Sequence, residues 1–274
     1  MQRKHAIGMG MLVGVGIVVG GFSWSVQQIR QREVDRQRLF RAIEHDDTAT
    51  VRALLESGVD ANMRLRMGVP LGLVDLIKIT LHVRPQSSTQ EHDTSALIAA
   101  ALRNQDPEIV RLLVAHGANV NAMVDGWTPL TVALDPSNGR PRLDVVQFLL
   151  EHGADPNLRS AVPGIDGPLF YALGGYRQNV DLGPLTKLLL DHGADPMQTE
   201  RGGRTYLTSE VWASHTKTVA AMLDHGADIN ARDKDNEGIT GGSGTTPLAA
   251  AISTGHIVML KMLLARGATR WTPA

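Results

Sequence analysis

The 274-residue sequence contains no cysteine, only 4% aromatic residues and almost no net charge. Without cysteine the chain forms neither a disulfide nor a thiolate metal site. Its 27 Lys and Arg residues nearly balance its 28 Asp and Glu residues, which leaves a formal charge of −1. A nucleic-acid-binding surface, which needs an excess of basic residues, is therefore not expected.

Motifs that carry catalysis or bind cofactors are also missing from the sequence. It contains neither G-x-S-x-G nor H-E-x-x-H, and "GGSGTTP" lacks the G-K-[ST] ending of a phosphate-binding loop. We therefore expect no enzymatic activity, no catalytic residues and no cofactor.

One long uncharged run, residues 6–26, lies near the N-terminus. As a helix it would span about 31 Å, close to the thickness of the hydrocarbon core of a bilayer. The run predicts a transmembrane helix over 6–26, after a basic head at 1–5 and before a juxtamembrane linker at 27–35. A cleaved export signal is the alternative, with small residues for cleavage at Ser23-Trp24-Ser25.

The orientation of this segment has two interpretations. More Lys and Arg residues follow the run than precede it. Taken alone, that asymmetry predicts that the downstream part stays in the cytoplasm. Large domains are nevertheless translocated with little regard to charge, and a short basic head is typical of an export signal. We expect a single-pass inner- or plasma-membrane protein with its large domain on the periplasmic side, or a soluble periplasmic protein if the signal is cleaved.

A sequence pattern recurs through the rest of the chain. It is seen in "VRALLESGVDAN", "VRLLVAHGANVNA", "VQFLLEHGADPN", "TKLLLDHGADP", "VAAMLDHGADINA" and "LKMLLARGAT". Several copies follow a turn and a helix start, as in "DGWTPLTVAL", "DGPLFYAL" and "GGSGTTPLAAAI". The recurring glycines are Gly58, Gly117, Gly153, Gly193, Gly226 and Gly267.

This pattern resembles the ankyrin repeat, whose consensus includes T-P-L-H-x-A and a later L-L-x-x-G-A-D. The resemblance covers residues 36–274 and implies an all-α ankyrin-repeat solenoid of about six helix-turn-helix repeats, behind one N-terminal transmembrane helix. The expected repeats are approximately 36–62, 94–122, 126–158, 166–198, 203–232 and 244–271, with an insertion at 63–93.

The residues of each copy account for a helix pair. Thr128 and Thr246 suit the N-cap of a first helix, and the proline after each suits the first helical position. The paired leucines Leu149-Leu150 and Leu263-Leu264 are expected on the buried face of a second helix. The glycine that follows ends this helix in a left-handed conformation. Because one helix pair cannot bury its own apolar face, the copies should stack into a solenoid.

One small-residue position in the first helix has an exception. Five of the six copies have alanine at this position, and the remaining copy, the fifth along the chain, has Glu210. A carboxylate in a crowded place is costly unless it is paired, so Glu210 is either a functional residue or lies on a rotated helix that exposes it to solvent. The alanines are Ala42, Ala100, Ala133, Ala172 and Ala251.

Four histidines stand directly before a turn glycine, one in each of four copies. Stacked helix pairs lie about 10 Å apart, which is too far for these side chains to share one ion through bonds of about 2 Å. An imidazole at a helix C-terminus interacts well with the open carbonyls. We therefore assign a structural role, with no metal, to His116, His152, His192 and His225.

The candidates for protein binding are the places where the chain departs from the repeat. In proteins that the repeat resembles, partners contact the turn fingers and the exposed side of the first helices. Trp, Tyr and Arg are the residue types that most often anchor interfaces. The alternative for each aromatic residue is packing against its own neighbouring repeat. The candidates are Trp127, Arg140, Tyr176, Arg177, Arg204 and Trp212.

The insertion at 63–93 is apolar in its middle and polar after Pro85. It either covers the N-terminal repeat or presents an apolar surface to a partner or membrane. Its "VPL" at Val69 can also begin a first helix, which would leave "TSALIAAAL" as an extra one. The expected function is that of a membrane-anchored protein-binding module of the cell envelope. Alternatives are a neutralising partner of a secreted enzyme toxin and a stress-protective accessory that stabilises an envelope enzyme.

Overall fold

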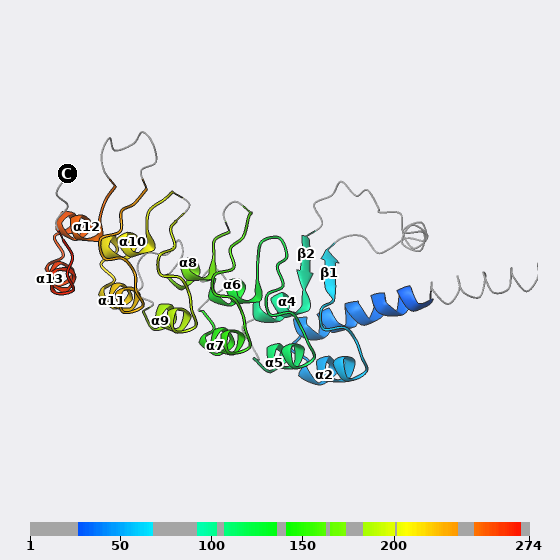
Figure 1. Cartoon of the computed structure of the whole chain (residues 1–274). Coiled ribbons are helices and arrows are strands. Elements are labelled where there is room, and N and C mark those ends of the chain that lie inside the picture. The colour runs from blue at the N-terminus through cyan, green and yellow to red at the C-terminus, as the bar shows by residue number, and fades with distance from the viewer. Residues whose placement is uncertain are drawn as a thin grey trace, which may run out of the picture.

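The computed structural model describes residues 27–67, 92–102, 107–135, 141–162, 165–173, 183–200, 202–234 and 244–269. Short helices lie in two rows, and successive pairs stack side by side along one axis (Figure 1). This arrangement confirms the predicted helical solenoid of stacked helix pairs.

The inner row holds the first helix of each pair. It consists of the helix over residues 27–44, α4 (Ala96–Leu102), α6 (Pro129–Leu134), α8 (Pro168–Ala172), α10 (Tyr206–Trp212) and α12 (Pro247–Thr254). The outer row holds the second helices, which are α2 (Thr48–Glu56), α5 (Pro107–Ala115), α7 (Leu143–Glu151), α9 (Gly183–Asp191), α11 (Thr216–Asp224) and α13 (Ile257–Ala265).

The structure corrects the expected localisation. Across the described ranges, which begin at residue 27, no helix combines the length and the apolarity needed to cross a membrane. The basic head at 1–5 and the run at 6–26 lie outside the described residues, and residues 27–35 belong to the helix over 27–44, which carries charged side chains along its length. The prediction of a single-pass membrane protein with an exported repeat domain is contradicted by this finding.

Local sequence signals set the helix ends as predicted. The Thr128 hydroxyl accepts a hydrogen bond from the N–H of Thr131, and Thr246 caps α12 in the same way, each with proline next in the chain. The turn glycines have φ between +84° and +92°, a region that side-chain-bearing residues avoid. A Cβ on any of them would meet nothing within 4 Å, so backbone conformation rather than space selects glycine here.

The core lies between the two rows and between successive pairs. Leu149 and Leu150 are 0% and 5% exposed, which confirms the first predicted leucine pair. In the last copy Leu263 is buried, but Leu264 is 53% exposed, so its predicted burial is wrong. The alanines at the small-residue position are all buried, as close helix approach requires: Ala42, Ala100, Ala133, Ala172 and Ala251.

A ladder of asparagine side chains links the turns of neighbouring repeats. Asn121 donates from Nδ2 to the carbonyl of Gly153 at 2.9 Å, and its Oδ1 accepts the N–H of Asp155 at 2.8 Å. Asn62 and Asn157 make the same pair of contacts one repeat before and one repeat after. This ladder was not predicted, although asparagine recurs in the sequence four residues after the turn glycine.

Met197 interrupts the ladder, because it lies four residues after Gly193 and only its sulfur approaches the N–H of Asp228, at 3.1 Å. We expect Met197→Asn to raise the free energy of unfolding by about 1 kcal/mol, since one net hydrogen bond contributes about 0.5–1.5 kcal/mol. Urea denaturation measures the change, with Met197→Ala as the control that removes the thioether without adding the amide. Equal stability of the two variants would contradict the ladder's role.

The insertion leaves and re-enters the stack through a small antiparallel sheet. β1 (Arg64–Met67) pairs with β2 (His92–Ser95), with Arg64 opposite Ser95. α4 follows β2 directly and packs against α5 and α6, so "TSALIAAAL" supplies the first helix of the second repeat. The "VPL" at Val69 and the apolar middle of the insertion lie outside the described residues.

Candidate protein-binding surface

Turn fingers project from the stack on the side of the inner helices (Figure 1). In one finger Val124 and Trp127 exchange backbone hydrogen bonds of 2.9 and 3.0 Å around a two-residue turn. The turn residues Asp125 and Gly126 have φ of 51° and 85°. An Asp-Gly pair suits a tight hairpin turn in which both residues have positive φ.

Trp127 serves the packing of this finger. Its side chain is half-buried against the hydrophobic core, and its ring centroid lies 5.6 Å from that of Tyr171 in α8. Contact with the next repeat is the alternative described above for each aromatic residue. The contact with Tyr171 agrees with this alternative for Trp127.

Trp212 and Arg204 are exposed and belong to the same repeat. Trp212 ends α10 with 42% of its surface exposed. The Arg204 side chain is 50% exposed, and its Nε lies 4.0 Å from Oδ2 of Asp233 in the following finger. Burial raises the pKa of the Asp233 carboxyl, while the N–H of Thr205 and the Arg204 guanidinium act in the opposite direction. Arg140, Tyr176 and Arg177 lie outside the described residues.

Glu210 forms a buried acid–imidazole pair. It is 6% exposed, so the interpretation that its helix turns it toward solvent is wrong. Its Oε2 lies 2.8 Å from Nδ1 of His215, at the start of α11. The pair borders a cleft of about 30 Å³ between α8 and α10, which Phe170 and Tyr206 also line. A carboxylate therefore fits at the small-residue position because an imidazole from the next helix meets it.

The four turn histidines confirm their predicted structural role. Each Nδ1 lies 2.8–3.0 Å from the carbonyl oxygen four residues earlier, at the end of an outer helix. Within the residues that the structure describes, no group of three or more His, Cys, Asp and Glu side chains is arranged to hold a metal ion. The role of these histidines is to satisfy helix-end carbonyls.

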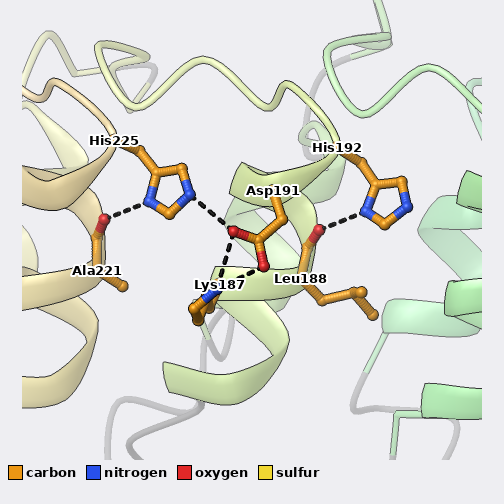
Figure 2. Close-up of polar contacts among 6 residues, drawn as sticks. All are labelled: Lys187, Leu188, Asp191, His192, Ala221 and His225. Carbon is orange, nitrogen blue, oxygen red and sulfur yellow. Dashed lines mark hydrogen bonds and ion pairs between the residues drawn. The ribbon is translucent and has the colours of Figure 1, made fainter.

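His225 makes a second contact that joins two outer helices (Figure 2). Its Nε2 lies 2.9 Å from Oδ1 of Asp191, whose Oδ2 accepts from Nζ of Lys187 at 2.6 Å. His225 thus bridges the carbonyl of Ala221 on its own helix and the carboxylate of Asp191 on α9. Hydrogen bonds from Lys187 and His225 lower the pKa of the Asp191 carboxyl. This bridge was not predicted, because Asp191 and His225 lie 34 residues apart in the sequence and are brought together only by stacking.

Stacked helix pairs with projecting turns define a repeat protein of the ankyrin type. A family model described as "Ankyrin repeats (3 copies)" matches residues 39–160 and 184–273, which is more than half of the chain. The chain therefore belongs to the ankyrin-repeat family.

Several longer proteins are similar in sequence to this chain over part of their length. Mouse Rabankyrin-5 is 26% identical over 232 residues, which is 84% of this chain and 17% of that protein. Human ankyrin repeat and SOCS box protein 6 is 31% identical over 46% of this chain and 30% of its own length. Human 2-5A-dependent ribonuclease is 46% identical over 23% of this chain but only 8% of its own length. The chain thus spans less than a third of each of these relatives.

Proposed function

We propose that this protein binds a protein partner through a surface made of Arg204 and Trp212, called here the repeat-five surface. The exposure of Trp212 at the end of an inner helix is the observation that carries the proposal. An exposed Trp offers a large contact area with few rotatable bonds and is among the residues that most often dominate binding energy. Ankyrin-repeat folds act as protein-interaction modules, which supports a protein partner.

The repeat itself does not require a Trp at this place. Trp212 lies seven residues after the N-cap Thr205, and the equivalent residue after Thr246 is the exposed Ser253. Leu102, at the end of α4, is likewise 45% exposed. Since Leu102 and Ser253 are also exposed at this position, the core does not require a buried side chain there, and the Trp212 side chain is available for a partner.

Arg204 directly precedes the N-cap of α10, the helix that Trp212 ends, and contributes a positive charge to the proposed surface. Asp233 lies at the limit of ion-pair distance and is itself largely buried, so the guanidinium is oriented by the next finger while half of its side chain remains in solvent. Arg presents several N–H donors in a planar group that matches a carboxylate. The partner surface that fits is an apolar pocket for Trp212 beside an acidic side chain.

We expect Trp212→Ala to weaken partner binding at least tenfold with little change in melting temperature, because the side chain is exposed in the free protein. Trp127→Ala is the matched control, and it should lower the melting temperature because Trp127 packs on Tyr171. Pull-down with each immobilised variant, quantified against the unmodified chain, and circular dichroism melts separate the two effects. If Trp212→Ala retains full capture of the partner, the repeat-five surface is not the binding site.

A further inference from the structure

Methionine supplies all of the sulfur in this chain, which has ten methionines and no cysteine. Among the methionines whose side chains the structure describes, Met197 is the exposed one, with 45% of its surface in solvent. Met222 and Met259, in contrast, are 0% exposed inside the stack. An oxidant in solvent therefore reaches the Met197 thioether much more readily than either of these buried sulfurs.

Met197 has the backbone position of a ladder asparagine. Its N–H donates to Oδ1 of Asp195 at 2.8 Å, as the N–H of Asn157 donates to Oδ1 of Asp155 at 2.8 Å. With the turn held in the same way, the Met197 side chain reaches the same target as the asparagines reach, a backbone N–H of the following repeat, here that of Asp228. The geometry of the ladder is thus kept at Met197, and the accepting atom is what differs.

The accepting atom at Met197 is a weak one. Oδ1 of Asn157 accepts the N–H of Asp195 at 2.8 Å, whereas the sulfur of Met197 lies 3.1 Å from the nitrogen of Asp228. Sulfur and Oδ1 are both three bonds from Cα, so they occupy the same place along the side chain. A thioether is nevertheless only a weak hydrogen-bond acceptor. The junction between the fourth and fifth repeats therefore lacks the oxygen acceptor that the neighbouring junctions have.

We propose that Met197 is a modification site at which hydrogen peroxide supplies this acceptor. A sulfur lone pair forms a bond to one peroxide oxygen while the O–O bond breaks, and the second oxygen leaves as water after taking up a proton. The sulfur loses two electrons and the peroxide gains them. The product, methionine sulfoxide, is polar and is converted back to the thioether by sulfoxide reductases.

The sulfoxide oxygen lies one bond beyond the sulfur and takes over the N–H of Asp228 once the side chain rotates. Such a rotation is open to Met197, because its side chain is unbranched, flexible and exposed. Oxidation of a methionine inside a core disrupts packing, whereas oxidation of Met197 adds a hydrogen-bond acceptor at a place already aimed at a donor. Peroxide therefore tightens the junction between the fourth and fifth repeats.

Amide hydrogen exchange tests this proposal on the full-length protein, because it reports the opening of individual backbone N–H groups. NMR measures the exchange rate at Asp228 before and after treatment with hydrogen peroxide. The N–H of Asp195, which Asn157 already binds, is the internal reference. Peptide mass spectrometry follows oxidation at each methionine. We expect Met197 to be oxidised at least ten times faster than either fully buried methionine, and Asp228 to exchange at least three times more slowly in the oxidised protein.

Two variants and a reversal step separate this contact from oxidation elsewhere in the chain. Met197→Leu has a side chain of similar size without sulfur, so peroxide should leave its exchange rate at Asp228 unchanged. Met197→Asn should exchange slowly at Asp228 before any treatment. Reductases for both sulfoxide epimers, driven by dithiothreitol, should restore the original rate in the unmodified sequence.

Three results overturn the proposal. The first is oxidation of Met197 no faster than that of the buried methionines. The second is an Asp228 exchange rate that stays the same or rises when Met197 is oxidised, which would mean that the sulfoxide turns to solvent. The third is a peroxide effect of equal size in Met197→Leu, which would assign the change to another methionine.

Discussion

Leu150→Ala and Leu190→Ala each lower the free energy of unfolding by about 2–5 kcal/mol, the range measured when a buried leucine is truncated and leaves a cavity. Both side chains lie three residues before a turn glycine and are at most 5% exposed. Each belongs to the continuous hydrophobic core of the stack, so removing it leaves a cavity inside that core. Stacked repeats depend on junctions between neighbours for their stability.

Leu264→Ala provides the matched control, because it makes the same chemical change at the same repeat position where the side chain is 53% exposed. We expect it to change stability by less than about 0.5 kcal/mol, as surface substitutions usually do. Urea denaturation should be run at a protein concentration below that of any self-association. If the three variants unfold alike, the position in the repeat and not burial decides the effect, and the burial argument fails.

The contrast between these leucines shows what the sequence predicted about the fold. Periodic leucines, N-cap threonines and turn glycines predicted the helix pairs, because each signal acts within one repeat. The exposure of Leu264 depends on which elements lie beside its repeat. The sequence pattern is the same in every copy, so it does not predict this difference. The prediction of a membrane protein was wrong. It rested on the uncharged run at 6–26 and the charges that flank it, which is a run outside the described residues, and no helix within the described residues is long and apolar enough to cross a membrane.

The candidate site was predicted less completely than the fold. Residue type singled out both Trp127 and Trp212, but only three-dimensional packing separates a tryptophan that contacts Tyr171 from one that is 42% exposed. Glu210 was identified as an exception to the alanine position, whereas its pairing with His215 was not predicted. The helix turn that places the imidazole against the carboxylate connects α10 and α11, and no spacing rule describes it.

The buried pair leads to the second large effect. His215→Ala should lower the free energy of unfolding by about 3–5 kcal/mol, because it removes the hydrogen-bond partner of a buried carboxylate and leaves that charge in the stack without it. The side chains of His215 and Glu210 are only 9% and 8% exposed, and their contact distance is 2.8 Å. Water therefore has little access to the Glu210 carboxylate and cannot replace the hydrogen bond from His215.

Glu210→Ala should be much milder, at about 1 kcal/mol, because it removes the charge and restores the residue found at this position in the five other repeats. The double variant Glu210→Ala/His215→Ala should then be more stable than His215→Ala by at least about 2 kcal/mol, since no buried carboxylate remains. Urea denaturation of the four proteins at neutral pH gives the coupling free energy as a double-mutant cycle. If the two changes in the free energy of unfolding are additive, the imidazole only fills space beside α10. A large coupling free energy instead shows that the imidazole stabilises the buried carboxylate of Glu210.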